Sequence, residues 1–242
     1  MTDHQTVSSR RLSRIIRQVI DHAGTDERSD LSVVRLESDG THLYAVATDR
    51  FTLAVARELL DRELNPDAQP FSVLLYPRDA AHLAKIADDE AFDDGQPWSA
   101  PTDFYTRLLV SDGRPPIAAA QVLVRKEGDI EHRDDVSAKY VPAPDVLPYD
   151  WRDLVRRCLQ TQSSESAAVR KMAFNPQLLA RWRSSDIEPL HFRFTGALNA
   201  VIVTGHNFLG VQLPVKPTDP SESFDAYASA WTIDLAPQAV DS

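Results

Sequence analysis

The segment LYAVATDRFTLAVARE, residues 43–58, alternates apolar and polar side chains on both sides of a central Thr48-Asp49-Arg50. Because successive side chains of a strand point to opposite faces, this period of two predicts two antiparallel strands joined by a tight turn. Similar runs predict strands over residues 31–38, which lead into an Asp39-Gly40 turn, and over residues 71–77. The first part of the chain must therefore build an antiparallel sheet.

A helix is predicted to precede these strands, capped by Ser8-Ser9 and ending near Gly24. Its apolar residues follow helical spacing and form one stripe: Leu12, Ile15, Ile16, Val19 and Ile20. Arg10, Arg14 and Arg17 share another face, with Arg11 nearby. The helix is therefore apolar on one side and rich in arginine on the other.

A second helix is predicted over residues 77–87, because proline suits the first helical turn and Pro77 opens this segment. Arg78, His82 and Lys85 are spaced to share its polar face. Residues 88–98 are acidic and predict a loop, and residues 103–113 and 118–129 predict strands. Helix and meander thus occur twice in the first 140 residues, which suggests an internal duplication of fold.

The organisation predicted from the sequence is a domain over residues 1–140, a proline-rich linker over 141–148, a shorter domain over 149–217 and a polar tail over 218–242. In the shorter domain, helices are predicted over residues 150–160 and 175–185, the latter capped by Asn175. Strands are predicted over residues 167–174, 189–196, 199–205 and 208–215. In the tail, SAWTIDL could add one edge strand.

Composition is that of a globular protein that can bury a core, with 242 residues, 43% hydrophobic and 26% charged. The longest apolar run is too short for a membrane span and the N-terminus lacks a signal-peptide core, so we expect a cytoplasmic protein with no membrane partner. One cysteine, Cys158, excludes an internal disulfide and a cysteine-based zinc cluster. The net charge of −10 and the pI near 5.1 argue against a protein that coats nucleic acid, unless its basic residues gather on one surface.

Signals for catalysis are weak. The seven histidines are scattered, and the eight glycines form no phosphate-binding loop. Cys158 could be an activated thiol, but a packed helical cysteine is the simpler interpretation. The pairs Asp88-Asp89 and Asp93-Asp94 could bind magnesium, but a solvated loop is favoured. We therefore expect no enzymatic activity, no cofactor and no metal site.

Six segments resemble the bacterial sliding clamp, the β subunit of DNA polymerase III. ATDRFTLAVARE is similar to the ATDGHRLAV hairpin of its middle domain, and ESDGTHLYAVATD to the hairpin that leads into it. LLYPRDAAHLAKI resembles the second helix of that domain, and YVPAPDVLP the connector that ends in Leu-Pro. MAFNPQLLARW and GVQLPVKP resemble the Asn-Pro helix and the C-terminal strand of the last domain.

The resemblance implies an α+β DNA clamp fold of two clamp-like modules, each with helices on one face of antiparallel sheets, the second truncated. Nothing here corresponds to the family's first domain. Its Gly-His-Arg is replaced by Arg50-Phe51-Thr52, and its terminal methionines by Leu213 and Val215.

The resemblance also implies a processivity factor that contacts the backbone of double-stranded DNA through its helices. The residues expected to contact phosphates are Arg10, Arg11, Arg14, Arg17, Arg78, Lys85, Arg152, Arg156, Arg157, Arg181 and Arg183. Acidic residues are expected in loops such as ADDEAFDD and EGDIEHRDD, which separates the two charges and reconciles DNA contact with the low pI. A solvated arginine face is the plain alternative.

A groove for short peptides of a DNA polymerase or other clamp-binding proteins is the second implied site. Its expected residues are Leu31, Thr48, Arg50, Phe51, Leu53, Pro148, Val211, Leu213, Pro214 and Val215. A homo-oligomeric ring, as a trimer or a dimer, and a clamp loader are also implied. The alternative is an adaptor or competitor that binds such peptides without encircling DNA; an ordinary hairpin core also explains Leu31 and Leu53.

Overall fold

The computed structural model describes residues 2–25, 31–92, 103–111, 118–126, 129–138, 150–160, 174–184, 190–194 and 200–214. In chain order, its elements are β1 (Thr2–Ser8), α1 (Ser9–Ile20), β2 (Val34–Ser38), β3 (His42–Thr48), β4 (Thr52–Leu59), β5 (Phe71–Leu75), α2 (Pro77–Phe92), β6 (Asp103–Ser111), β7 (Ala118–Lys126), β8 (Asp129–Ala138), α3 (Trp151–Gln160), α4 (Pro176–Ala180), the 3₁₀ helix η1 (Arg181–Ser184), β9 (His191–Arg193), β10 (Val201–Thr204) and β11 (Phe208–Gln212).

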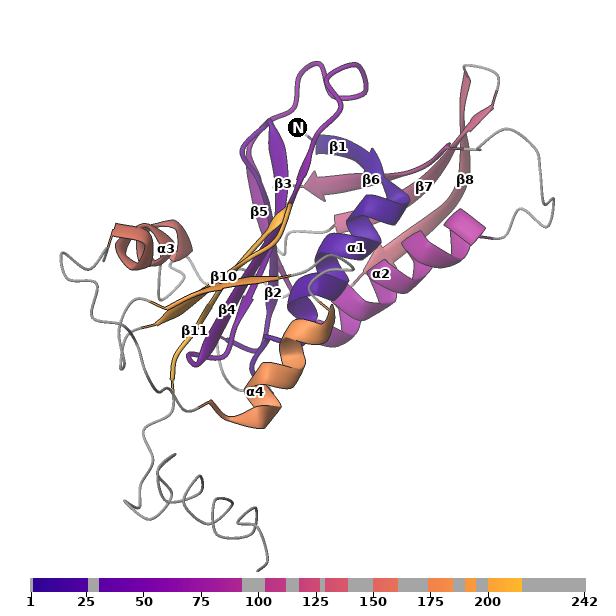
Figure 1. Ribbon diagram of the computed structural model, residues 1–242. Coiled ribbons are helices and arrows are strands. Elements are labelled where there is room, and N and C mark those ends of the chain that lie inside the picture. Colours follow the sequence, from indigo (N-terminus) through magenta and orange to yellow (C-terminus); the bar gives the residue numbers. More distant parts are fainter. Residues whose placement is uncertain are drawn as a thin grey trace, which may run out of the picture.

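The strands form two antiparallel sheets, with the orders β1-β6-β7-β8 and β5-β2-β3-β4-β11-β10-β9 (Figure 1). The predicted repeat is confirmed, since the order strand, helix, three strands occurs from β1 to β4 and again from β5 to β8. The first strand of each unit pairs with the other unit, β1 with β6 and β5 with β2. The two units are therefore joined into one body by exchanged edge strands.

The larger sheet continues across both predicted modules. Strand β4 of the first pairs with β11 of the second, so that Leu53 lies opposite Val211 and Thr52 opposite Gln212. Since a β ladder satisfies the backbone groups of both strands, this junction is built like the interior of a sheet. The predicted linker, residues 141–148, lies outside the described residues.

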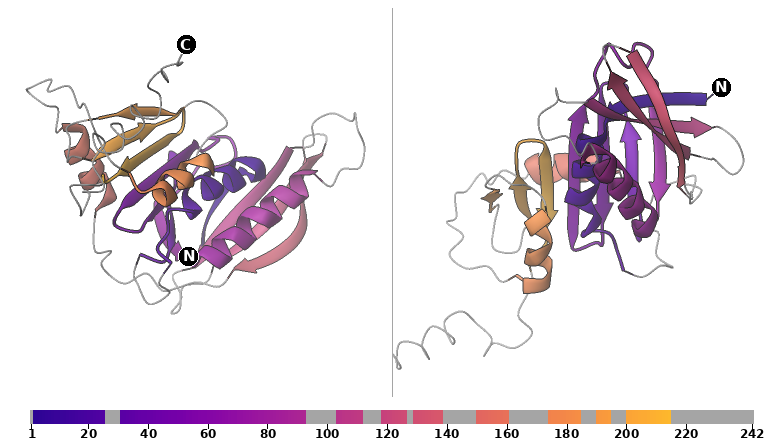
Figure 2. Two further views of the ribbon diagram at one scale, coloured as in Figure 1. Left: turned by 60° about the horizontal axis from the view of Figure 1, so that its bottom comes forward. Right: turned by 90° about the vertical axis from the view of Figure 1, so that its right-hand side faces the viewer.

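Helices α1 and α2 lie side by side, with α1 packed on the larger sheet and α2 mainly beside the smaller sheet (Figures 1 and 2). The predicted apolar stripe is confirmed, because the side chains of Leu12, Ile15, Ile16 and Val19 have no exposed surface. They pack in one core with Leu36 of β2 and Trp182 of η1. Burying four large aliphatic side chains stabilises the fold by about 1.5–3 kcal/mol each before entropy costs are counted.

The predicted α+β class, with helices packed on antiparallel sheets, is confirmed, with one difference in helix placement. Helix α3 packs against the opposite face of the larger sheet from α1 (Figure 2). Trp151 and Val155 of α3 pack with Leu53, Val55 and Val211, whereas the neighbouring Ala54 and Ala56 face the core beneath α1. The prediction that helices cover a single face therefore does not hold for α3, because alternate residues of β4 are apolar on both faces.

Strand β1 is absent from the predicted elements, because TDHQTVS has no apolar alternation. It is a strand because of its neighbours: β6 pairs along its whole length, and Asn65 covers its other edge. The Asn65 side chain accepts the N–H of Thr6 at 2.7 Å and donates to its carbonyl oxygen at 2.8 Å. A single amide side chain thus replaces a neighbouring strand and protects the edge.

Other predicted boundaries were wrong. Helix α2 continues to Phe92, so part of the acidic segment expected as a loop is helical, and EGDIEHRDD lies largely in β8. Tertiary pairing with β7 overrides the low strand propensity of that segment. Helix α1 ends at Ile20 rather than near Gly24. At its start Ser8 makes no capping hydrogen bond through its side chain, and Ser9 Oγ pairs instead with Thr106 Oγ1 at 2.8 Å.

In the second module, the predicted helix over residues 175–185 is confirmed in two parts, α4 and η1. Its cap is as expected, since the Asn175 side chain accepts the N–H of Gln177 at 2.9 Å. Strand β9 is shorter than the predicted residues 189–196. The strands expected over residues 167–174 and in SAWTIDL, and the acidic pair Asp93-Asp94, lie outside the described residues, apart from Phe174, which is not in a strand.

Candidate functional site

The turn between β3 and β4 is held by its own side chains. Asp49 Oδ1 accepts the backbone N–H of Phe51 at 3.0 Å and of Thr52 at 2.8 Å, and the Thr52 hydroxyl at 3.0 Å. Thr48 Oγ1 donates to the carbonyl oxygen of Thr52 at 2.6 Å. Arg50 has a φ of +80°, which a non-glycine residue adopts at a cost of about 1 kcal/mol. Glycine adopts such a φ without a clash, so Arg50 is a strained choice for this turn.

Asp49 also joins the turn to the second module. Arg181 Nη1 of η1 donates a hydrogen bond to Asp49 Oδ2 and forms an ion pair with it. The same Nη1 donates to Thr52 Oγ1 at 3.2 Å. Burial would raise the pKa of Asp49, but the hydrogen bond from the Thr52 backbone and the Arg181 guanidinium outweigh it and hold the pKa below its usual value. Arg181, expected to contact DNA, is thus engaged inside the molecule.

Trp182, the next residue, fixes η1 against the sheet. Its ring lies 4.3 Å from the His22 ring and its Nε1 donates to Gln212 Oε1. Gly210 leaves room for it, because a Cβ there would lie 2.3 Å from Trp182 Cζ3. His22 is fully buried, and its pKa is lowered to about 3, first by burial and then by the charge of Arg181. Sequence reasoning missed this cluster, although a glycine in strand β11 is a recognisable signal of close approach.

The expected groove residues are brought together in part. Thr48, Leu53 and Val211 lie at the β3-β4-β11 junction, but Leu53 is 2% exposed and Val211 5% exposed. Trp151 and Val155 of α3 cover them. Leu31 is buried just ahead of β2, with its carbonyl oxygen accepting the N–H of Gly24 at 2.9 Å. Pro148 and Val215 lie outside the described residues.

Two apolar side chains at this junction are exposed, Phe51 by 57% and Leu213 by 42%. The N–H of Leu213 donates to the carbonyl oxygen of Phe51 at 2.8 Å, so they meet where β11 ends beside the turn. Arg50 is exposed next to Phe51, and Pro214 is half-buried after Leu213. We call Arg50, Phe51, Leu213 and Pro214 the junction rim.

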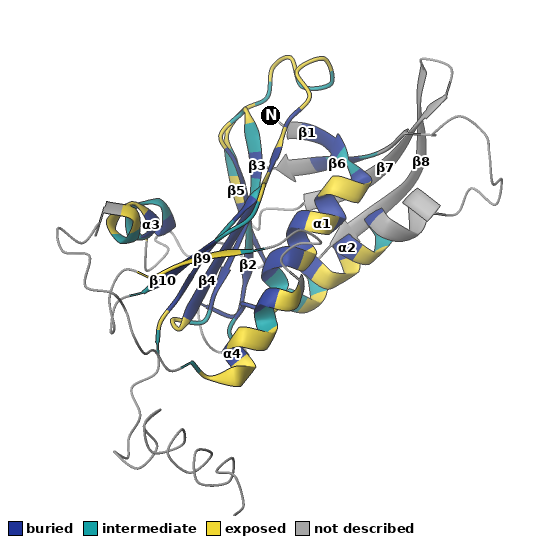
Figure 3. Ribbon diagram, viewed as in Figure 1, coloured by how far each residue is buried: buried dark blue, intermediate teal, exposed yellow. Residues whose placement is uncertain are grey.

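On α1, all four expected arginines are exposed, and Figure 3 shows the exposed side of the α1 and α2 ribbons facing away from the sheets. Arg11 and Arg14 pair with a carboxylate of the sheet on which α1 packs. Glu58 of β4 is 3% exposed and lies under α1, where it accepts Arg14 and lies 3.9 Å from Arg11. Strand alternation places Glu58 on the same face as Ala54 and Ala56, and a carboxylate on an apolar face is the sequence signal that could have found it.

The remaining expected cations are divided between the two faces. Arg78 and Lys85 are exposed on α2, and Arg183 is exposed on η1, which packs near α1. Arg156 and Arg157 of α3 lie on the other side of the larger sheet and pair with Asp153 at 3.4 and 3.0 Å. The structure therefore groups the cations of α1, α2 and η1 and separates them from those of α3.

Arg152 anchors α3 to the sheet. It pairs with Glu37 of β2, which is 5% exposed and also forms an ion pair with Arg35, whose Nε lies 2.8 Å away. The Arg152 guanidinium lies over the Tyr44 ring at 5.0 Å and over the Trp151 ring at 4.2 Å. Trp151 Nε1 lies 3.5 Å from Glu37 Oε2. Arg152, expected to contact DNA, thus holds its own helix in place.

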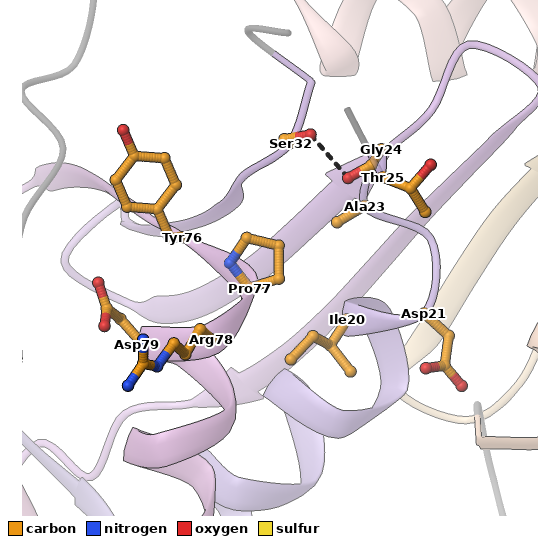
Figure 4. Close-up of a pocket in the computed structure, with 10 residues that line it drawn as sticks. All are labelled: Ile20, Asp21, Ala23, Gly24, Thr25, Ser32, Tyr76, Pro77, Arg78 and Asp79. Carbon is orange, nitrogen blue, oxygen red and sulfur yellow. Dashed lines mark hydrogen bonds between the residues drawn. The ribbon is translucent and has the colours of Figure 1, made fainter. Parts of the chain in front are cut away.

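A surface pocket of about 640 Å³ lies between the end of α1 and the start of α2 (Figure 4). Ile20 and Asp21 line it from α1 and the residue after it, and Tyr76, Arg78 and Asp79 from the start of α2. Ser32 Oγ donates to the carbonyl oxygen of Gly24 at 2.7 Å on its wall. None of the expected groove residues lines this pocket.

No group of three His, Cys, Asp or Glu side chains that could bind a metal ion occurs in the described part of the chain. Burial raises the pKa of the Cys158 thiol, which is half-buried and packs against the cluster under α3. A thiol with a raised pKa is a poor nucleophile at neutral pH, which agrees with a packing role. None of the described helices has the length and apolar content needed to cross a membrane.

Comparisons with known proteins show the fold. No family model and no curated protein sequence matches the chain. Solved structures do: the DNA polymerase III β subunit of Thermotoga maritima has a TM-score of 0.59 at 15% identity, covering 89% of this chain and 66% of that protein. The sliding clamp of Pseudomonas aeruginosa has a TM-score of 0.57 at 15% identity, covering 88% and 67%. That of Bacillus subtilis has a TM-score of 0.51 at 15% identity, covering 88% and 64%.

The chain thus spans about two thirds of the length of the solved clamps that it matches. At such identities the likeness is one of backbone arrangement, and site residues must be argued from this chain's own contacts. This protein therefore has the fold of bacterial DNA polymerase III β sliding clamps, in a shortened form.

Proposed function

We propose that this protein is a sliding-clamp-like replication factor that contacts double-stranded DNA through α1, α2 and η1 and holds a polymerase or other partner at the junction rim. The observation that carries the proposal is the separation of the two surfaces: the cations of α1 and α2 are exposed on the side of these helices that faces away from the sheets, and Phe51 and Leu213 are exposed at the β4-β11 junction. The activity would be tethering, without catalysis, cofactor or metal.

For DNA, the favourable feature is a basic helical surface on an acidic protein with a net charge of −10. Phosphate contact by Lys and Arg is independent of sequence and weakens steeply with salt, which suits a protein that must move along DNA. Glu58 holds Arg14, and more loosely Arg11, with their side chains still about half exposed. Fixing a guanidinium in place while leaving it in solvent lowers the entropy lost on binding a phosphate.

For the partner, the junction rim offers two exposed apolar side chains beside the end of a strand. An extended peptide with one or two apolar anchors fits such a surface. The junction rim is not an open groove, because α3 covers Leu53 and Val211, which would form the bottom of such a groove. The peptide would therefore rest on Phe51, Leu213 and Pro214 rather than insert down to Leu53.

The test measures DNA binding against salt with the full chain. Arg10→Gln with Lys85→Gln removes two exposed charges from the helical side. We expect weaker binding and a salt slope lower by roughly 1–2, since each lost phosphate contact lowers it by about 0.9. The matched control is Arg57→Gln with Arg62→Gln, two exposed arginines in β4 and in the segment that follows it. Equal losses in both variants would mean that total charge, not this surface, controls binding.

A second candidate function is an adaptor that binds clamp-type peptides without a ring. Two expected DNA contacts pair with carboxylates inside the molecule, Arg152 with Glu37 and Arg181 with Asp49, which favours this alternative. A ring that encircles DNA requires a stable trimer or dimer, and a clamp loader would be the partner that places it on DNA. Light scattering of the purified protein separates the two, because a monomer at micromolar concentration supports the adaptor.

A further inference from the structure

Strand β9 is an open edge of the larger sheet. It pairs with β10 on one side, its three residues are all exposed, and no described strand pairs with its outer side. The unpaired N–H and C=O groups of an exposed edge strand are a template for another strand, and proteins usually cover such edges.

One face of this edge is apolar. Phe192 and Phe194 are two residues apart and so share a face, and they are 42% and 46% exposed. Phe192 lies opposite Val203, which is buried in the core beneath α1. The Phe174 ring lies 6.3 Å from that of Phe194, and Leu190 packs against the same core. The edge therefore continues the main core into solvent, where large apolar side chains are costly to leave uncovered.

The other face of the edge is basic. His191 and Arg193 alternate with the phenylalanines, and both are exposed. Arg193 reaches toward α3, where its Nη2 donates to the carbonyl oxygen of Leu159 at 3.4 Å. A strand that completes this edge should therefore be apolar on the α1 side and acidic or polar on the α3 side.

The chain contains a segment with that pattern after its last described strand. In SAWTIDL, residues 229–235, the side chains of Trp231, Ile233 and Leu235 share one face and those of Thr232 and Asp234 the other. Paired with β9, the first set would lie beside the phenylalanines, and Asp234 would lie on the side of Arg193. Both faces match at once, which a strand of the opposite register cannot achieve.

Reach and direction also fit. Gln212 at the end of β11 lies opposite Val201 at the start of β10, and Ile202 lies opposite Arg193 at the end of β9. The chain thus leaves β11 at the end of the sheet where a strand antiparallel to β9 would begin. The distance to be crossed is three strand spacings, about 15 Å, whereas the 14 residues 215–228 can extend over roughly 46–50 Å.

We propose that residues 229–235 of the same chain form an eighth strand antiparallel to β9, with Trp231 and Ile233 covering Phe192 and Phe194. This strand addition closes the open edge of the sheet. It stands on the β9 edge and the tail sequence, and it is independent of the proposed DNA function.

The test is amide hydrogen exchange of the full chain, followed in the peptide that contains β9. In the wild type β9 should be protected, and Trp231→Asp with Ile233→Asp should speed its exchange at least tenfold. Phe224→Asp, an apolar residue of the tail outside the segment, is the matched control and should leave β9 protected. An unprotected β9 in the wild type, or equal protection in the double variant, would overturn the proposal.

A charge exchange tests the same pairing without an apolar-to-charged change. Asp234→Arg should expose β9 to exchange, and Arg193→Asp added to it should restore the protection. Failure of the restoration would contradict the predicted face of Asp234. If the protection of β9 rises with protein concentration, the tail of a second copy covers the edge, and the intramolecular proposal is wrong.

Discussion

The backbone N–H of Leu213 donates to the carbonyl oxygen of Phe51 at 2.8 Å, which continues the β4-β11 ladder beyond its last paired residues, Thr52 and Gln212. Residues 162 positions apart in the sequence are thereby joined where both side chains are exposed. The junction rim therefore combines a backbone hydrogen bond between the ends of β4 and β11 with two exposed apolar side chains.

Peptide binding at the junction rim is predicted to depend on Leu213 and Phe51 rather than on Leu53. Leu213→Asp should abolish capture of a polymerase-derived clamp-binding peptide while leaving the unfolding midpoint within experimental error, because the side chain is exposed. Leu53→Asp should destabilise the whole fold by about 3–5 kcal/mol, because it buries an unpaired charge under α3. Unchanged peptide capture by folded Leu213→Asp, measured by fluorescence anisotropy, would rule out the rim.

Arg50 is predicted to be a source of strain. Arg50→Gly should raise the free energy of unfolding by about 0.5–1 kcal/mol, because glycine adopts a positive φ without a clash. The control is Gly40→Ala at the other positive-φ turn, where the new Cβ would lie 3.0 Å from the Ala68 carbonyl oxygen and should lower stability. Urea unfolding measures both changes, and a loss of stability in Arg50→Gly would contradict the argument.

Gly210 is predicted to be irreplaceable while Trp182 is present. Gly210→Ala should destabilise the protein by about 1–3 kcal/mol, since its Cβ would overlap the indole ring. Adding Trp182→Leu, itself destabilising, should make the effect of the Gly210→Ala change much smaller. A thermal-unfolding double-mutant cycle measures this coupling, and simple additivity would show that the two residues do not meet.

Acid should weaken the fold through His22. Its folded pKa of about 3 lies below the ordinary histidine value of 6.5, so the unfolded chain binds the proton more readily. The stability contribution is therefore complete above about pH 6.5 and is lost as the pH falls from there toward 3. His22→Phe should flatten the stability profile between pH 6.5 and 4, measured by urea unfolding at each pH. Asp49, whose pKa is lowered, acts only at more acidic pH.

Glu58 is predicted to position the arginines of α1 and to lower the positive charge that this surface presents to DNA. Glu58→Gln should destabilise the protein by about 1–3 kcal/mol, because Arg14 loses a buried carboxylate partner. The same change removes a negative charge beneath α1 and should steepen the salt dependence of DNA binding. An exposed control, Glu63→Gln, should change neither quantity. Weaker DNA binding by a folded Glu58→Gln would mean that Glu58 acts mainly by positioning the arginines.

Local pattern was enough to predict most of the elements. The hairpin of β3 and β4, the apolar stripe of α1 and the Asn175 cap are each properties of a few consecutive residues, and the structure has them as expected. The expected alternation is not seen in burial, because β3 and β4 are buried on both faces. Strands β1 and β8 were missed because their residues carry no periodic signal, and pairing with β6 and β7 is what makes them strands. The family resemblance supplied the order of the elements, which local pattern does not contain.

The site was less predictable, for an electrostatic reason. The sequence by itself determined that arginines line one side of α1 and that a turn lies at Thr48-Asp49-Arg50, because helical and strand periodicity depend only on nearby residues. Only the tertiary structure decided which charges are used internally, since these pairs join residues far apart in the sequence: Glu58 with Arg14, Glu37 with Arg152 and Asp49 with Arg181. It also decided that α3 covers Leu53 and Val211, because both faces of β4 are apolar and the chain pattern alone does not say what packs on each.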